Sequence, residues 1–179
     1  MRRIVLFVAT LALTAPVHAA EPGRVEIQGL RLTIPTSWVR TPASSNVRAA
    51  QYRVPRAGTD TEDGEFVVFF FGKGKGGGLE ENLSRWYDQF SQPDGRSSRE
   101  AAVVTSRTVR GLKVTAVDLS GTYRGMAPGS GPPTASTRML AAVVEGAEGP
   151  WFLKATGPAT TMAEAKPGFD ALLLSLEPH

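Results

Sequence analysis

A glycine-rich run, residues 72–78, is the part of this sequence whose spacing most resembles a binding motif. It matches G-x-G-x-x-G from Gly72 onward, and it lies between a predicted strand and a predicted helix. Glycines placed in this way let an anion approach the backbone N–H groups at a helix N-terminus. The candidate binding residues are Lys73, Gly74, Lys75 and Gly76.

Two acidic residues argue against a nucleotide at this run. Glu80 and Glu81 would lie where the phosphates bind, and the surrounding sequence lacks repeated βαβ units. A P-loop is excluded, because the lysine and hydroxyl required after its second glycine are absent. We interpret the run as a mobile surface loop, and contact with an anion or a partner through Lys73 and Lys75 is the alternative.

The acidic segment at residues 60–65 resembles a calcium-binding loop in composition. Its glycine, Gly64, stands one place too early for an EF-hand, and Phe71 occupies the twelfth position, where such a loop carries glutamate. We interpret the segment as a solvated acidic turn, with weak binding of a divalent cation as the alternative. No metal site is predicted.

Side chains for nucleophilic catalysis are missing from the sequence. It has no cysteine, which excludes a thiol nucleophile, and its two histidines are His18 and His179. His179 is the last residue, where chain ends commonly fray, so no Ser–His–Asp triad is predicted. A pair of carboxylates can still hydrolyse glycosides. The acids that could contribute are Asp88, Asp118 and Glu145. We expect no enzyme activity and no cofactor.

The first residues have the composition of a cleavable signal peptide. Arg2 and Arg3 precede an apolar run at residues 4–13, and the small residues around Ala19 suit signal peptidase. The run is too short to span the roughly 30 Å of a bilayer core. We predict a signal peptide at 1–19, a single domain at 20–179, and a periplasmic or secreted protein without stable membrane insertion after cleavage.

The charge balance gives no case for nucleic-acid binding. The chain has 20 basic and 17 acidic residues, and two of the basic residues lie in the predicted signal peptide. The remaining balance is close to neutral, whereas nucleic-acid binders usually carry a strong basic patch. The expected partner is a protein or an envelope component.

Short apolar or alternating segments predict strands joined by hairpins. They lie at residues 25–27, 30–34, 47–54, 66–71, 101–109, 112–123, 139–144 and from 151 onward. The six apolar residues at 66–71 put hydrophobic groups on both faces of one strand, so both faces need cover. The segment 125–133 is predicted to be a loop, and Gly157 is expected at a special backbone angle in a turn after the last strand.

Two amphipathic helices can supply that cover. The first carries an apolar stripe from Leu79 to Phe90. In the second, Thr161 and Glu164 fit a capping box, and Pro167 is expected to kink or split the helix. The predicted fold class is α+β, a mainly antiparallel sheet covered by helices on both faces, which is an α/β/α sandwich.

The order of these elements resembles the PsbP-like superfamily, which includes DcrB-type bacterial envelope proteins. The matching pieces are the L-T-I-P-T-S-W run at 32–38, the apolar strand before a tryptophan-bearing helix, the central hairpin, and the closing helix with Phe169 and 172–176. The resemblance implies an antiparallel sheet between helices and mostly non-catalytic roles, such as accessory subunits, partner docking and sometimes metal association. This chain differs in lacking a lipidation cysteine and a histidine in its body, so no functional residue is carried over.

These observations lead to one leading hypothesis for function and two alternatives. The leading hypothesis is an exported accessory domain that binds a protein partner or an envelope component without catalysis. The first alternative is a small-ligand or anion-binding protein that uses the 72–78 loop. The second is a carboxylate-based hydrolase, which needs two acids within about 5–10 Å of each other in one cleft.

Overall fold

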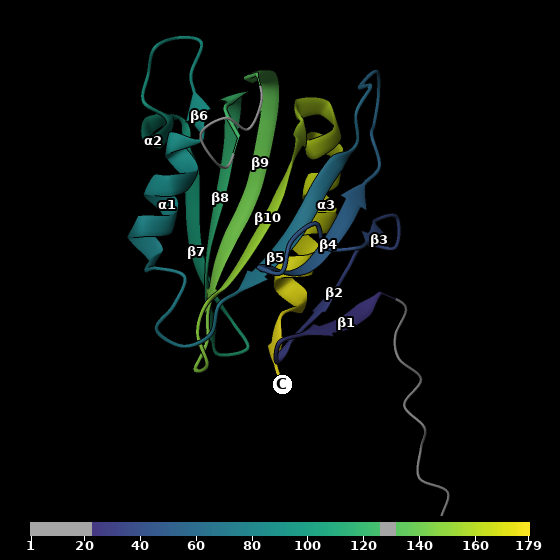
Figure 1. Cartoon of the computed structure of the whole chain (residues 1–179), viewed down its shortest axis with the longest axis vertical. Coiled ribbons are helices and arrows are strands. Elements are labelled where there is room, and N and C mark those ends of the chain that lie inside the picture. The colour runs from purple at the N-terminus through teal and green to yellow at the C-terminus, as the bar shows by residue number, and fades with distance from the viewer. Residues whose placement is uncertain (1–22, 126–131) are drawn as a thin grey trace, which may run out of the picture.

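The computed structural model describes residues 23–125 and 132–179 (Figure 1). The predicted signal peptide at 1–19 and most of the predicted loop at 125–133 lie outside the described residues. The elements in chain order are β1 (Arg24–Ile27), β2 (Leu30–Thr33), β3 (Val39–Thr41), β4 (Arg48–Val54), β5 (Gly64–Phe70), α1 (Leu79–Asp88), β6 (Phe90–Ser91), α2 (Ser98–Ala101), β7 (Val103–Val109), β8 (Leu112–Tyr123), β9 (Thr134–Glu145), β10 (Trp151–Pro158), α3 (Ala159–Ser175) and β11 (Glu177–Pro178).

The main sheet has eight strands, in the order β3-β4-β5-β10-β9-β8-β6, with β7 paired to β8. Its strand pairs are antiparallel. The hairpin between β7 and β8 turns at Arg110 and Gly111, which both have positive φ, as a two-residue turn of this kind requires. The structure is a mixed α+β fold dominated by an antiparallel sheet, as the sequence predicts.

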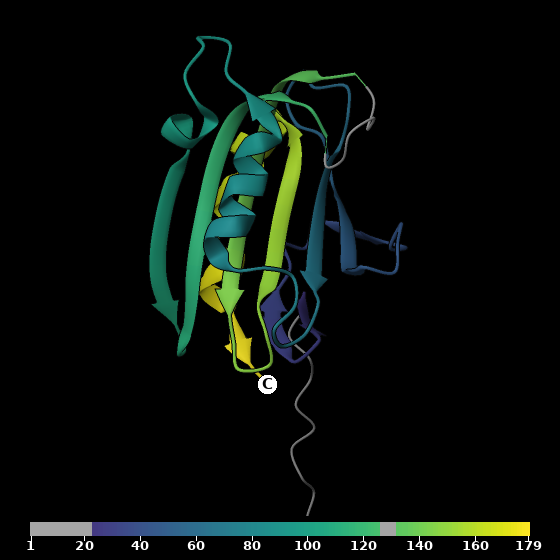
Figure 2. The same cartoon turned by 60° about the vertical axis from the view of Figure 1, so that its left-hand side comes forward.

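Neighbouring residues of β5 enter two different hydrophobic clusters. Phe66 and Val68 pack in a cluster that contains Phe169 of α3, whereas Val67 packs in a cluster that contains Trp86 of α1. Successive residues of a strand point to opposite faces, so the apolar run at 66–71 finds apolar contacts on each side of β5. Figure 2 shows α1 lying over the middle of the main sheet.

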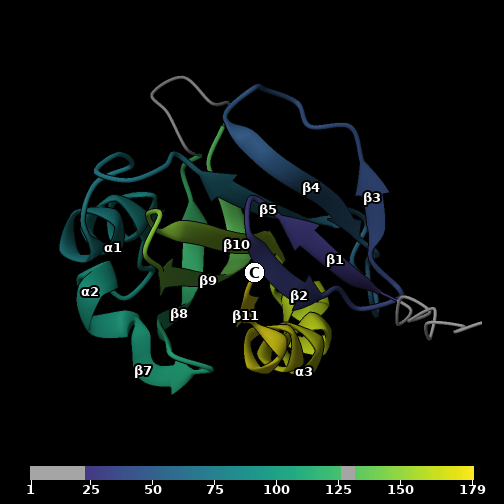
Figure 3. The same cartoon turned by 90° about the horizontal axis from the view of Figure 1, so that it is seen from below.

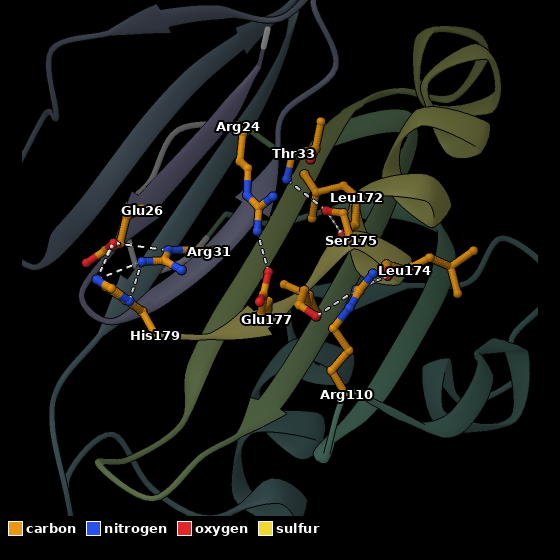
Figure 4. Close-up of polar contacts among 11 residues, drawn as sticks. Arg24, Glu26, Arg31, Thr33, Arg110, Leu172, Leu174, Ser175, Glu177 and His179 are labelled. Carbon is orange, nitrogen blue, oxygen red and sulfur yellow. Dashed lines mark hydrogen bonds and ion pairs between the residues drawn. The ribbon is translucent and has the colours of Figure 1, made fainter. Parts of the chain in front are cut away.

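A second, smaller sheet joins the two ends of the described chain, in the order β1-β2-β11 (Figure 3). In the close-up of Figure 4, the backbone N–H of Thr33 donates to Ser175 Oγ at 2.8 Å, and Arg24 contacts Glu177. The backbone N–H of His179 donates to the carbonyl of Gly29 at 2.9 Å. The expectation of a frayed His179 is therefore wrong, because β11 pairs with β2 and holds the last residue against the hairpin.

The start of α3 differs from the sequence prediction, and Pro167 does not split the helix. The helix begins at Ala159, so Thr161 lies inside its first turn and does not form a capping box with Glu164. The helix runs without a break through Pro167 to Ser175. Buried side chains on both sides of the proline, such as Met162 and Phe169, share one cluster, and this packing offsets the lost backbone hydrogen bond.

Among the residues that the structure describes, no helix is both long enough and apolar enough to cross a membrane.

Candidate functional site

A cavity of about 570 Å³ lies on the main sheet, on the face that α1 packs against. Its floor is formed by alternate residues of β5 and β10, and its walls come from segments 59–63, 134–137 and 157–160 together with Tyr123. The floor residues are Glu65, Val67, Phe69, Lys154 and Thr156. We call this cavity the Lys154 pocket. Its size is typical of cavities that bind small molecules.

Lys154 is the central polar residue of the floor. It lies in the middle of β10, where its register partners are Val67 and Ala141, and its exposed fraction is 5%. Its Nζ donates to Gln89 Oε1 at the end of α1 and to the Tyr123 hydroxyl oxygen at 3.4 Å. The Tyr123 ring centroid lies 5.1 Å from Nζ, within reach of a cation–π interaction.

Burial changes the protonation of both residues. Burial lowers the pKa of Lys154 to about 7, with Glu65 opposing the shift and Arg48 adding to it. Burial also raises the pKa of Tyr123 to about 12, and the negative charge of Glu65 adds to that shift. Near neutral pH the side-chain amine of Lys154 is therefore only partly protonated, while Tyr123 keeps its phenolic proton.

Glu65 is held in place from β4. Gln51 Nε2 donates to Glu65 Oε1 at 2.8 Å, and Arg48 Nη1 lies 2.9 Å from Glu65 Oε2. The second contact is an ion pair rather than an aligned hydrogen bond. Arg48 therefore neutralises the carboxylate of Glu65 at the floor of the pocket. When Lys154 is protonated, the three side chains together carry a net positive charge.

Thr156 adds an unpaired hydroxyl to the same floor. Its Oγ1 is buried and has no hydrogen-bond partner among the described residues. An unpaired buried hydroxyl is costly, typically about 1–3 kcal/mol. Such groups in native structures call for an explanation, and an ordered water or another bound molecule is one.

The close approach of two glycines shapes the wall beside Thr156. Gly157 lies within β10 and is absent from the residues with positive φ, so the expected turn with a special backbone angle is wrong. The residue is small for another reason, since a Cβ at Gly157 would lie 2.7 Å from the Cα of Gly64. The close approach of β10 to β5, and not a turn, therefore explains why residue 157 is a glycine.

The acidic segment at 60–65 is built into the fold. Asp60 Oδ2 accepts hydrogen bonds from the backbone N–H and the hydroxyl of Thr161, both at 2.7 Å, and so caps the first turn of α3. Asp63 accepts from the backbone N–H of Arg56 at 2.8 Å. The interpretation as a merely solvated turn is therefore incomplete. Among the residues that the structure describes, no group of three or more His, Asp or Glu side chains could hold a metal ion.

The glycine run at 72–78 lies apart from the pocket. Lys73 and Lys75 are exposed and are not among the residues that line the Lys154 pocket. Asn82 Nδ2 holds the run by donating to the carbonyls of Gly76 and Gly78, both at 2.9 Å. The Glu81 carboxylate lies 2.6 Å from the position of a Cβ on Gly77, so negative charge occupies this end of the run. Anion binding here remains a prediction.

The three acids considered for hydrolysis lie in different places. Asp88 is exposed at the end of α1, and Glu145 lies at the end of β9, 3.2 Å from Lys113. Asp118 lies in β8, where both carboxylate oxygens accept hydrogen bonds from Arg138 at 2.7 and 2.8 Å. None of the three lines the Lys154 pocket.

Lys154 was not among the residues that the sequence singled out. The available signal was a lysine inside the apolar run Trp151–Ala155, at a position where alternation places the side chain under α1. Lysines are almost never fully buried without a partner. A lysine in a strand that must be covered on both faces therefore indicates a buried charge, and this signal is independent of the glycine run.

No protein-family profile matches the chain, and no curated protein matches its sequence. Among solved structures, the chain is similar to cyanobacterial PsbP from Synechocystis, with 12% identity and a TM-score of 0.56. That match covers 93% of this chain and 99% of the PsbP chain. A second match is PA94 from Pseudomonas aeruginosa, a protein of unknown function, with 12% identity, a TM-score of 0.49, and coverage of 87% of this chain and 96% of PA94.

The chain has a PsbP-like fold. The predicted resemblance is thereby confirmed for the arrangement of elements, with coverage of almost the whole chain. At 12% identity the likeness concerns the fold alone. The function has to be argued from the residues of this chain.

Proposed function

We propose that this chain is an exported, non-catalytic binding domain that holds a small ligand in the Lys154 pocket. The observation that carries the proposal is a set of buried polar groups on the pocket floor, with Lys154 in the middle of a strand and the unpaired Thr156 hydroxyl beside it. Buried polar groups are costly unless they are hydrogen-bonded. A ligand that satisfies them gains affinity from groups that the empty fold leaves unpaired.

The arrangement favours binding over catalysis. Glu65 is fixed by Arg48 and Gln51, and Asp60 is used to cap α3, so the carboxylates beside the pocket already have structural partners. A carboxylate acting as general base must be free to exchange protons with the substrate, and these two are held by other groups. The pocket floor is mainly a donor surface, which suits recognition of a ligand.

The remaining parts of the proposal concern location and fold. The basic residues and the apolar run at the start of the chain support export to the periplasm or the medium. We also propose that the fold is an α/β/α sandwich, with α1 and α3 over opposite faces of the main sheet. The two separate hydrophobic clusters, one with α1 and one with α3, support this description.

A thermal-melting screen with a pair of tryptophan variants tests the proposal. Thr134 is exposed and lines the pocket, and Thr105 is an exposed strand residue on β7 that does not line it. A ligand at 100 times its Kd stabilises the native state by about 2.7 kcal/mol. Carboxylic acids, amines, sugars and amino acids at millimolar concentration form the panel, and the proteins are the wild type, Thr134→Trp and Thr105→Trp.

We expect at least one compound to raise the melting temperature of the wild type and of Thr105→Trp, but not that of Thr134→Trp, whose indole fills the pocket. The proposal is refuted if no compound raises the melting temperature, or if Thr134→Trp responds as strongly as the wild type. Unchanged melting of the two variants without ligand shows that both still fold.

A further inference from the structure

The floor of the Lys154 pocket carries more hydrogen-bond donors than acceptors. Nζ of Lys154 has three N–H donors, and its acceptors among the described residues are Gln89 Oε1 and the Tyr123 oxygen. Tyr123 accepts that bond and keeps its own O–H, and the Thr156 hydroxyl has no partner among the described residues. Three donors on residues that line the pocket therefore have no acceptor among the described residues.

The charges on the floor favour an acceptor that is negative. Arg48 neutralises Glu65 across β4 and β5, and the third charged group is Lys154. When Lys154 is protonated, the sum over these three side chains is positive. An oxyanion placed at the floor accepts from several donors at once and compensates this charge, and charge-assisted hydrogen bonds are about twice as strong as neutral ones.

The walls limit the rest of the ligand. Val67 and Phe69 give the floor an apolar part beside Lys154, and Ala135 and Pro158 add apolar wall. Asp60, Glu62 and Asp63 line the wall formed by segment 59–63, so a second negative charge on the ligand would meet carboxylates there. These walls suit a molecule with one anionic end and an apolar body.

We infer that the pocket binds a small monocarboxylate, with the carboxylate on the donors of Lys154, Tyr123 and Thr156 and the apolar body against Val67 and Phe69. This inference rests on the proposed function, because it names the chemical class of ligand for the same pocket. The carboxylate requires the protonated form of Lys154, so binding takes up a proton near and above neutral pH.

Calorimetric titration with hexanoate and with hexanamide tests the inference. The two compounds have the same apolar body, and hexanamide lacks the charge. The charged or titratable groups around Lys154 are Glu65, Arg48 and Tyr123 from the strands and Arg85 from α1. Three carboxylates of the preceding loop, Asp60, Glu62 and Asp63, also line the pocket. None of them has an ordinary pKa between 6.5 and 8.5, so a change of affinity in this range reports on Lys154.

We expect hexanoate to bind at least tenfold more tightly than hexanamide at pH 6.5. Its affinity should fall roughly 25-fold between pH 6.5 and 8.5, because the binding-competent fraction falls with the protonation of Lys154. Lys154→Met should lose hexanoate binding and keep its weak affinity for hexanamide. Thr156→Val, which removes one hydroxyl at constant shape, should weaken hexanoate binding severalfold. The matched control is Lys113→Met, at an exposed lysine paired with Glu145 away from the pocket.

The outcomes separate this inference from the proposed function. Equal affinity for hexanoate and hexanamide, or hexanoate binding that Lys154→Met retains, overturns the inference and leaves a ligand-binding pocket. A pocket ligand from the melting screen with no carboxylate, found while hexanoate fails to bind, also overturns the inference alone. Failure of every compound in both experiments overturns the proposed function as well.

Discussion

Replacement of Lys154 by methionine should stabilise the protein near neutral pH, and the stabilisation should fade as the pH rises. Methionine has a similar length and carries no charge, so Lys154→Met removes the cost of burying an ammonium. The folded pKa is about 7, below the ordinary value of 10.5. Since one pKa unit corresponds to about 1.4 kcal/mol, the full cost at low pH is about 5 kcal/mol.

The sign of the pH dependence follows from the direction of the shift. Between pH 7 and 10.5 the unfolded chain holds a proton on Lys154 that the folded chain releases, so stability of the wild type rises with pH in this window. The methionine variant lacks this contribution. It also leaves Gln89 Oε1 without its donor, a cost of about 1–3 kcal/mol that does not change with pH.

Urea unfolding followed by tryptophan fluorescence at pH 7, 8, 9 and 9.5 measures the difference. The free energy of unfolding of Lys154→Met relative to the wild type should fall by about 3 kcal/mol across this range. The unfolded tyrosines titrate above it and are the same in both proteins. Lys113→Met, at an exposed lysine, should show a difference that stays flat. A flat difference for Lys154→Met as well would mean that Nζ is solvated and would refute the reasoning.

Three further substitutions test the packing around the pocket and at the end of α3 by urea unfolding. Arg110→Ala removes the guanidinium that donates to the last carbonyls of α3 at 2.9 and 3.2 Å, and we expect a loss of about 1 kcal/mol. Gly157→Ala places a methyl group 2.7 Å from a backbone atom of β5 and should cost more than about 2 kcal/mol, whereas Gly78→Ala, with open space around it, should cost about 1 kcal/mol or less. Asp60→Ala removes the cap of α3 and should cost about 1–2 kcal/mol, against less than about 0.5 kcal/mol for the exposed neighbour Glu62→Ala.

The secondary structure was largely accessible from the sequence because its signals are local. The segments 101–109 and 112–123, the apolar run at 66–71 and the stripe on α1 each predicted an element that the fold contains. Elements that depend on contacts between residues far apart in the chain could not be predicted from the sequence. The start of α3 is fixed by Asp60, about a hundred residues earlier, and β11 forms because the chain end meets β2.

The pocket was not predictable from spacing, because its residues come from separate strands. Glu65, Tyr123 and Lys154 are brought together by the antiparallel order β5-β10-β9-β8, which no local pattern encodes. The glycine run at 72–78, by contrast, is contiguous and therefore visible. A short contiguous motif is easier to recognise in a sequence than a single lysine in an apolar strand. The buried charge is nevertheless the stronger physical constraint, because burying it is costly.

Chemical-shift mapping of the ligand-binding site tests most directly the central claim that the Lys154 pocket binds a small ligand. The backbone amides of the protein are followed by ¹H–¹⁵N NMR while the best compound of the melting screen is titrated in. We predict that the largest shifts occur at Glu65–Phe69 of β5 and Lys154–Gly157 of β10, the strands that form the pocket floor. Shifts confined to residues 72–78, with the pocket strands unchanged, would contradict the account and return the binding site to the glycine run.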